Sequence, residues 1–418
     1  MKLPSLFVVI SKLLISALSM IWSALLISSL GEENSGLFFS SVALVMILGS
    51  ISRLGFDSDI VKRYSLKKHL IQKQEPYYLL AVFVLSLLLF SLAFLVSYAY
   101  DLKFIHRDIL YAIIPIALIT VISFFRQAEG KYVLSVWLSS GFYWVVSIIL
   151  MYTLSFVLIL DIDYVTHFFV GSLFFVLLFF IFLNRSVLAI ELRKVWQCDA
   201  INNLHSSIKL FGANVSNMLF MWLPTLIIGG MGDLSGATYY SVAQKVSFMI
   251  SFVFSAINVL LLRELSIDYV KNFINFERKI VVTTIANILL ATPIFLLILI
   301  FGADILKLFS IESDRALIFL YILSISQFLN VFGGANGLIM TAVGEYKIVF
   351  LANLLSLVGL LLCMFIASIY GSSTMIAASV LVMVFLLNFF MSYMVYEKTK
   401  VFILDLKCFN REFFKAVK

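Results

Sequence analysis

The sequence is short of charge. Only 13% of its 418 residues are Asp, Glu, Lys or Arg, whereas soluble domains carry about 25%. With 62% hydrophobic residues and a mean hydropathy of +1.08, it cannot be a water-soluble domain, because no globular fold hides that much apolar surface. Proline is also scarce, at 5 residues, and the apolar residues do not alternate with polar ones as barrel strands require. These shortages favour an all-α integral membrane protein.

Residues that bind metals or perform catalysis are few. The three cysteines, Cys198, Cys363 and Cys408, form no CxxC pair and have no metal-ligand spacing, and the four histidines are scattered. The sequence therefore predicts no catalytic residue, no metal site and no cofactor. The longest connection, roughly residues 184–207, is too short for a soluble catalytic domain, so we expect a transporter and not an enzyme.

Long apolar stretches recur along the whole chain. Each reaches the roughly 20 residues that a helix needs to cross a bilayer. Twelve such spans are predicted, at 6–30, 37–58, 77–99, 109–128, 133–160, 165–183, 208–230, 237–261, 279–301, 316–341, 348–370 and 374–396.

The connections between these spans differ in charge on the two sides of the membrane. Those on the side of the N-terminus carry most of the Lys and Arg residues, among them Lys62, Arg63, Lys67, Lys68 and Arg278. Opposite connections are mostly acidic or neutral. The positive-inside rule therefore places both termini in the cytoplasm of a bacterial inner membrane. It also explains the net charge of +7 without a nucleic-acid partner.

An internal repeat of about 200 residues divides the chain. Ser41-Val42-Ala43 matches Ser241-Val242-Ala243, and Gly130-Lys131-Tyr132 occupies the place of Gly344-Glu345-Tyr346. Each half then holds an even number of spans, so the two repeats are parallel. We expect a six-helix half at residues 1–200 and a second at 201–418.

Two glycine-rich segments carry a resemblance to a known family. They read GEENSGLFFSSVA from Gly31 and GDLSGATYYSVAQKVS from Gly232, and FGADILKLF follows at residues 301–309. The chain resembles the MOP superfamily of MATE exporters and polysaccharide-lipid flippases, and within it the Wzx-type O-antigen flippases. The resemblance implies two six-helix bundles in a V, with spans 1, 2, 7 and 8 around a central cavity.

Four basic residues fall inside or at the ends of these same spans, namely Lys12, Arg53, Lys209 and Lys245. Charges in spans are costly and indicate function, although long side chains near helix ends also snorkel to the headgroups. Acids are not found at mid-span, and Asp57 and Asp59 read as boundary charges on different faces of a helix. A cationic cavity suits a diphosphate, whereas an exporter of cationic drugs needs buried acids.

Neutral polar residues on the same spans suit the hydroxyl groups of a sugar. Interhelical hydrogen bonding is the alternative role for each of them. The candidates are Asn214, Asn217, Asn258 and Gln244.

The sequence thus predicts a flippase for an undecaprenyl-pyrophosphate-linked oligosaccharide of O-antigen or capsule type, acting in lipopolysaccharide or polysaccharide biosynthesis. Its expected partners are the lipid-linked oligosaccharide, membrane lipids and other polysaccharide-assembly membrane proteins. The coupling ion, proton or sodium, is left open. The alternatives are a MATE-like drug or metabolite exporter and, in another class, a membrane-embedded glycosyltransferase or polymerase.

Overall fold

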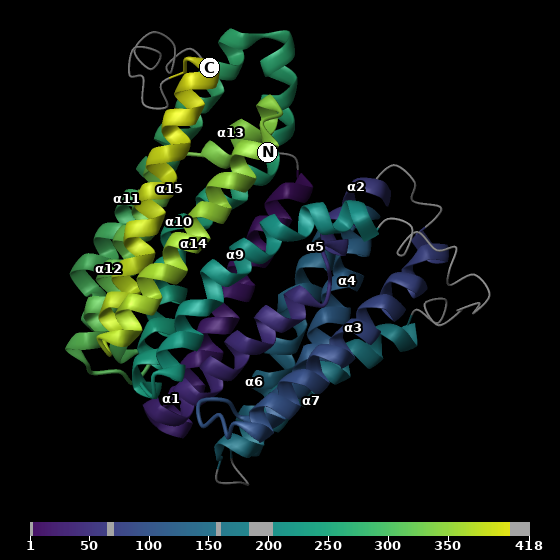
Figure 1. Ribbon diagram of the computed structural model, residues 1–418, viewed down its shortest axis with the longest axis vertical. Coiled ribbons are helices and arrows are strands. Elements are labelled where there is room, and N and C mark those ends of the chain that lie inside the picture. The colour runs from purple at the N-terminus through teal and green to yellow at the C-terminus, as the bar shows by residue number, and fades with distance from the viewer. Residues whose placement is uncertain (1–2, 65–70, 156–159, 184–203, 402–418) are drawn as a thin grey trace. The chain divides into compact units, whose positions relative to one another are not determined.

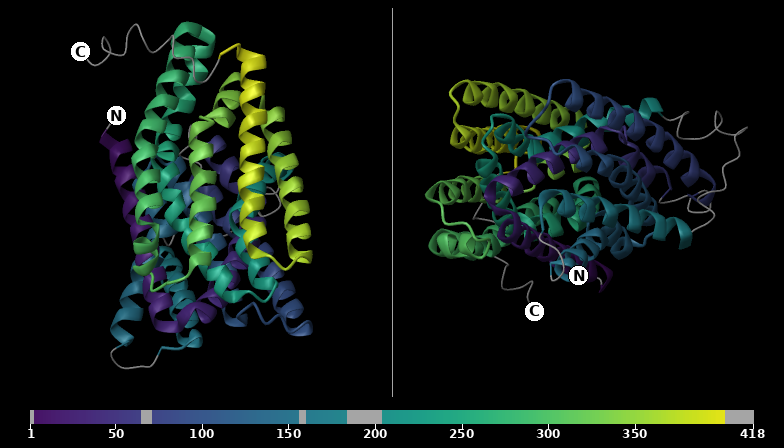
Figure 2. Two further views of the ribbon diagram at one scale, coloured as in Figure 1. Left: turned by 90° about the vertical axis from the view of Figure 1, so that its left-hand side faces the viewer. Right: turned by 90° about the horizontal axis from the view of Figure 1, so that it is seen from below.

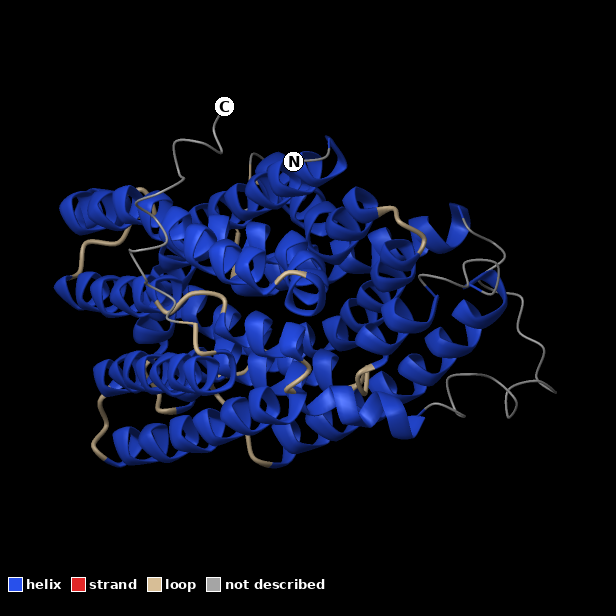
Figure 3. Ribbon diagram, turned by 90° about the horizontal axis from the view of Figure 1, so that it is seen from above, coloured by secondary structure: helices blue, strands red, loops and turns tan. Residues whose placement is uncertain are grey.

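The chain is built of helices (Figure 3). The structure is a computed structural model and describes residues 3–64, 71–155, 160–183 and 204–401. Within these residues no strand occurs. The apolar composition predicts this outcome, because a helix satisfies all its backbone hydrogen bonds within one segment.

The first helices cover the N-terminal half of the chain (Figure 1). Two short irregular helices occur among the long ones: η2, a 3-10 helix, and η3, a π-helical turn. The bounds are α1 Leu3–Ile51, α2 Phe56–Tyr64, α3 Ile71–Ala99, η2 Arg107–Ala112, α4 Ile113–Ala128, α5 Tyr132–Val136, η3 Trp137–Gly141, α6 Phe142–Leu154 and α7 Ile162–Leu183.

The C-terminal half includes two long helices, α10 of 38 residues and α11 of 35. Both reach well beyond the length that a bilayer requires. The helices of this half are α9 Leu204–Gly230, α10 Leu234–Lys271, α11 Phe273–Lys307, α12 Asp314–Phe332, α13 Asn336–Val343, α14 Tyr346–Ile369 and α15 Ser373–Thr399.

Within the described residues, the twelve predicted spans fall mostly on helix, with breaks inside the predicted spans 37–58 and 316–341. Nine helices in the described part of the chain are long and apolar enough to cross a membrane. One of them, Phe7–Ile51, has 45 residues, or about 68 Å at 1.5 Å per residue, more than twice the roughly 30 Å of a hydrocarbon core. Gly31 interrupts it with a φ of 75° and a ψ of 177°, so this helix supplies spans 1 and 2. The all-helical, multi-pass membrane fold is confirmed.

The internal repeat has a counterpart in the backbone. Gly31 and Gly232, matched in the sequence, both have positive φ, at 75° and 83°. Gly130 and Gly344, the other matched pair, have φ values of 88° and 94°. Each of the latter precedes one capping residue and a helix that begins at tyrosine, Tyr132 or Tyr346. Equivalent places in the two halves thus have equivalent turns.

Backbone contacts divide the chain into two compact units, unit 1 at residues 1–238 and unit 2 at residues 239–418. Unit 1 has an aromatic core in which Trp22 of α1 contacts Phe38 and Trp144, and Phe169 packs on both of the latter. Trp22 and Phe169 are fully buried. The predicted boundary between residues 200 and 201 lies outside the described residues and stays a prediction.

Unit 2 packs its long helices against one another. α11 lies against α12, α12 against α15, and α15 against α14, with α15 running among the other green and yellow helices (Figure 2). A buried cluster that includes Leu265, Phe276, Met340 and Val395 joins α10, α11, α13 and α15. These apolar contacts fix the helix on which Lys245 lies.

Candidate functional site

Lys245 lies in a tightly packed part of α10. It is eleven residues after Leu234, the first residue of that helix, which places it about 16 Å along the axis. Tyr240 and Ser247 are fully buried and Gln244 is 8% exposed, whereas Lys245 is partly exposed. It is the sole basic residue between Leu234 and Arg263 in the sequence. Such a charge, far from a helix end, costs several kcal/mol to hold in hydrocarbon by insertion scales, about 3 for Lys.

Arg53 lies at the turn between α1 and α2, which uses positive φ at Leu54 (46°) and Gly55 (78°). The residue is only 5% exposed, and its Nε lies 3.9 Å from Oδ2 of Asp57. A snorkelling arginine would instead be extended toward solvent. The structure therefore pairs this cation with a buried carboxylate of its own unit.

The other predicted site residues fall into two groups. Lys12 is partly exposed on α1 and Asn217 is exposed on α9, both in unit 1, while Gln244 and Lys245 belong to unit 2. The side chains of Lys209, Asn214 and Asn258 lie outside the described residues. A cavity shared by these residues stays a prediction.

Sequence reasoning missed a buried charge network in unit 1. Arg126, at the end of α4, forms ion pairs with Glu75 and, at 2.7 Å, with Glu129. Lys131 Nζ lies 2.9 Å from the second oxygen of Glu129, and the guanidinium of Arg126 sits 5.5 Å from the ring centroid of Phe180. Glu75 and Arg126 are 2% and 6% exposed. A pattern search had little chance of finding the pair, because 51 residues separate its members.

Asp57 and Asp59 follow the turn between α1 and α2. Both are buried, at 7% and 2% exposure, and their interpretation as boundary charges at the cytoplasmic side stays a prediction. Asp57 faces Arg53, and Asp59 accepts a hydrogen bond of 3.3 Å from the Tyr78 hydroxyl. Tyr78 in turn packs on Phe56, Tyr64 and Phe125. Their two-residue spacing did not reveal that Asp57 pairs with Arg53 or that Asp59 contacts Tyr78 of α3.

The two matched glycine turns meet within unit 1. The backbone carbonyl of Leu234 lies so close to Gly36 that an added Cβ would be 1.8 Å from its oxygen. The Thr238 hydroxyl donates a hydrogen bond of 2.6 Å to the carbonyl of Glu32, and α1 packs along α9. Gly36, the second glycine of GEENSGLFF, is thus required because the backbone of Leu234 approaches it closely.

No protein-family model and no curated protein matches this sequence. Solved structures do match along nearly the whole chain. An inward-facing multidrug resistance MATE transporter of the MOP superfamily aligns with 94% of this chain and 98% of its own, at a TM-score of 0.65 and 14% identity. The lipid II flippase MurJ, in an inward closed conformation, aligns with 99% and 95% at 0.64 and 12% identity.

A third match has a bearing on charge. It is a MOP superfamily transporter from Pyrococcus furiosus whose binding pocket is described as reversed in polarity, with coverage of 97% and 94%, a TM-score of 0.62 and 15% identity. These proteins are transporters and flippases. The chain therefore has the fold of MOP superfamily transporters.

Proposed function

We propose that this protein is a flippase that moves an undecaprenyl-pyrophosphate-linked oligosaccharide from the inner to the outer leaflet of a bacterial cytoplasmic membrane. The observation that carries the proposal is Lys245, a basic residue some 16 Å along a packed helix of a chain with a transporter fold. The lipid II flippase among the solved structures makes a lipid-linked substrate compatible with this fold.

The charge of the substrate decides what the protein must supply. Two unit charges 4 Å apart attract by about 1 kcal/mol in water, but by about 4 kcal/mol at an effective dielectric constant of 20. A cation held inside the membrane therefore offsets part of the cost of bringing a diphosphate out of water. Lys245 would act as a point charge on the diphosphate, with Lys12 and Lys209 as further cations. Arg53 would contribute the part of its positive charge that the carboxylate of Asp57 does not neutralise.

The acidic residues of unit 1 argue against a drug-exporter pocket of the cationic type. The buried carboxylates of Asp57 and Glu75 face Arg53 and Arg126, and Asp59 accepts from Tyr78. Carboxylates engaged in this way are poor ligands for a cationic drug.

In the proposed cycle the sugar headgroup enters between the halves, its hydroxyls meet Asn214, Asn217, Asn258 and Gln244, and the halves then rock to open outward.

A MATE-like exporter of a drug or metabolite is the second candidate, because multidrug MATE transporters share the fold. Deletion of the gene has different consequences for the two functions. Loss of the exporter raises drug sensitivity and leaves surface polysaccharide intact, whereas loss of the flippase removes polysaccharide.

Substitutions at Lys245 test the proposal. In a host whose chromosomal copy is deleted, Lys245→Ala should impair surface polysaccharide, Lys245→Arg should retain more, and Lys245→Glu should do worst, because it places like charges together. Membrane levels of all variants are matched by immunoblot. Lys271→Glu is the control, since it makes the same charge change at an exposed position in the last turn of the same helix. Normal surface polysaccharide with Lys245→Glu would contradict the proposed cationic mechanism.

A further inference from the structure

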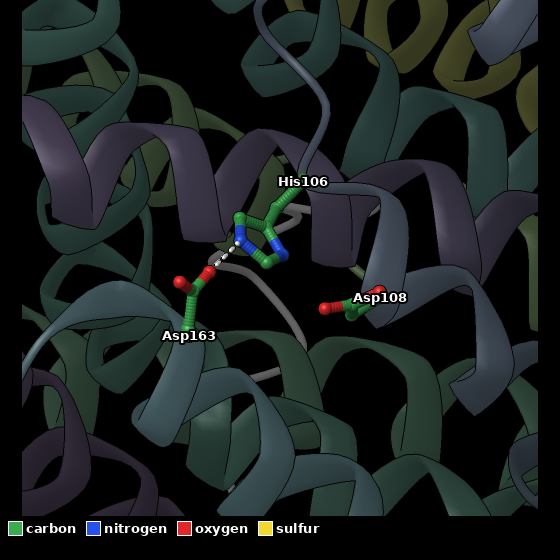
Figure 4. Close-up of side chains that lie close together, drawn as sticks. All are labelled: His106, Asp108 and Asp163. Carbon is green, nitrogen blue, oxygen red and sulfur yellow. Dashed lines mark hydrogen bonds and ion pairs between the residues drawn. The ribbon is translucent and has the colours of Figure 1, made fainter.

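Two histidines and two aspartates converge at one end of unit 1. His106 and Asp108 lie at the start of η2, and Asp163 lies in the first turn of α7 (Figure 4). His167 follows Asp163 by four residues on the same helix. One ligand atom from each of His106, Asp108 and Asp163 lies within 4.8 Å of the others. His167 joins them through Nε2, which is 3.8 Å from Oδ2 of Asp108. In the predicted orientation this end faces outward.

Local hydrogen bonds and packing fix both segments of the cluster, the start of η2 and the start of α7. The backbone N–H of His106 donates a hydrogen bond of 2.7 Å to the Ser41 hydroxyl of α1, and Ile105 and Ile109 on either side are buried. In the second segment Asp161 accepts a hydrogen bond of 2.9 Å from the Tyr164 N–H. That cap fixes the start of α7, whose pitch puts Asp163 and His167 on one face. The four side chains are therefore presented by fixed backbone.

Asp163 determines which nitrogen of each histidine carries a proton. The His167 Nδ1 lies 2.5 Å from the Asp163 carbonyl oxygen. A carbonyl only accepts, so Nδ1 is protonated and a neutral His167 keeps its lone pair on Nε2, facing Asp108. The carboxylate of Asp163 likewise accepts from Nε2 of His106 at 2.8 Å, which leaves the lone pair of neutral His106 on Nδ1.

The Nδ1 atom of His106 is buried and has no hydrogen-bond partner among the described residues. Figure 4 shows the His106 ring between the two carboxylates, with this nitrogen on the side of Asp108. The carboxylate of Asp108 thus lies near both imidazoles, with a ring nitrogen of His106 within 4.8 Å and His167 Nε2 at 3.8 Å. A histidine whose other nitrogen is held by a carboxylate or a carbonyl is the arrangement that orients metal ligands.

The charge of the cluster also calls for a cation. The two carboxylates, Asp108 and Asp163, give the cluster a formal charge of −2 when each His is counted as neutral. Arg107, the adjoining basic residue, turns to Asp101 at 2.8 Å and to the ring of Tyr98. A divalent ion would balance the cluster.

We propose that this cluster is a site for one divalent transition-metal ion of the Zn²⁺ class. His106 Nδ1, His167 Nε2 and Asp108 supply the ligands, and Asp163 holds both rings. Imidazole with carboxylate selects zinc-like ions over Mg²⁺ and Ca²⁺, which prefer all-oxygen sites. Tetrahedral ligands at zinc are about 3.3 Å apart, so separations of 3.8 Å between His167 and Asp108 need only small side-chain rotations.

Such an ion would join two segments that the sequence separates by 57 residues, since that is the spacing of His106 and Asp163. It would tie η2, which leads into α4, to the start of α7. The spacing also explains why sequence analysis predicted no metal site, because each segment alone holds one histidine and one or two aspartates.

The test uses the full-length protein, purified in detergent with its affinity tag removed. Zn²⁺ is the probe and Mg²⁺ the comparison ion. Bound metal is measured by mass spectrometry after desalting, and stability by the thermal unfolding midpoint. We expect one Zn²⁺ per chain and a raised midpoint. Asp108→Asn and His167→Ala should each weaken Zn²⁺ binding at least tenfold, and Asp163→Asn about 10–100-fold through loss of ring orientation.

Two control variants keep the result specific. Asp304→Asn removes an exposed carboxylate that pairs with Lys307 in unit 2, and His205→Ala removes a histidine from elsewhere in the sequence. Both should bind Zn²⁺ as the unaltered protein does. The His167 and Asp163 side chains are 62% and 64% exposed, so their replacement should leave the fold intact. Absence of Zn²⁺ binding, or equal binding by the His106→Ala/His167→Ala double variant, overturns the site and leaves only a histidine–aspartate ion pair.

Discussion

At the scale of single residues, two buried arginines of unit 1 lie against carboxylates. Arg126 meets Glu75 and Glu129, and Arg53 meets Asp57. Each buried ion costs several kcal/mol to desolvate, and its partner repays that cost only when both are present. A membrane protein that buries such a network is therefore more sensitive to the loss of one member than to the loss of the whole.

Substitution of Arg126 tests this point. Arg126→Ala should lower stability by about 3–5 kcal/mol, because it leaves Glu75 buried without its counter-charge. The Arg126→Met/Glu75→Gln double variant should recover part of the loss. The measurement is thermal unfolding followed by tryptophan fluorescence in detergent.

The comparison is Lys398→Ala, which removes a partly exposed ion pair with Glu345 at 3.1 Å and should cost at most about 1 kcal/mol. Equal destabilisation by Arg126→Ala and Lys398→Ala would show that the network is no more than a surface feature.

At the scale of elements, the close approach of two turns makes a sharp prediction. Gly36 touches the backbone of Leu234, so Gly36→Ala should force the segments apart or lower the unfolding midpoint, since backbone cannot yield as a flexible side chain does. Gly171→Ala on α7 is the matched control, because nothing lies within 4 Å of its added Cβ, and alanine there should be neutral or stabilising. Tolerance of alanine at both glycines would mean that the turns are not packed as described.

The helices themselves were predictable from the sequence, because hydropathy over some 20 residues reports directly on burial in lipid. Their irregularities were not. The predicted span at 316–341 is broken after Phe332, where Gly334 has a φ of 72°. A Cβ on Gly333 would lie 2.6 Å from Oδ1 of Asn388 in α15. That break, like the π-helical turn at Trp137–Gly141, depends on a neighbouring helix, which no local pattern contains.

The site was predictable only in part. Composition singled out Lys245 and Arg53 because few residues in the spans are charged; the structure buries Arg53, and the role of both residues in a binding site stays a prediction. Asp57 lies only four residues after Arg53, but Glu75, which pairs with Arg126, and the cluster around Asp108 depend on segments brought together by folding. Their spacing in the sequence bears no relation to their chemistry.

At the scale of the whole molecule, the repeat is visible in the paired glycine turns, each with positive φ. An even number of spans in each repeat, as the sequence predicts, would give both halves the same sense in the membrane. With the predicted twelve spans, the C-terminus would lie on the same side of the membrane as the N-terminus, and the charge of the connections predicts which side that is.

The orientation yields the last prediction. The positive-inside rule places Lys68 and Lys271 in the cytoplasm and Glu33, Asp161 and Asp233 outside. In a variant lacking Cys198, Cys363 and Cys408, a cysteine introduced at Glu33, Asp161 or Asp233 should react in intact cells with a membrane-impermeant thiol reagent. One at Lys68 or Lys271 should react only after the membrane is permeabilised, which also controls for buried thiols. Glu33 lies near the break at Gly31, so its labelling checks in addition that α1 crosses twice. The reverse pattern would invert the orientation, and with it the leaflet from which the substrate enters.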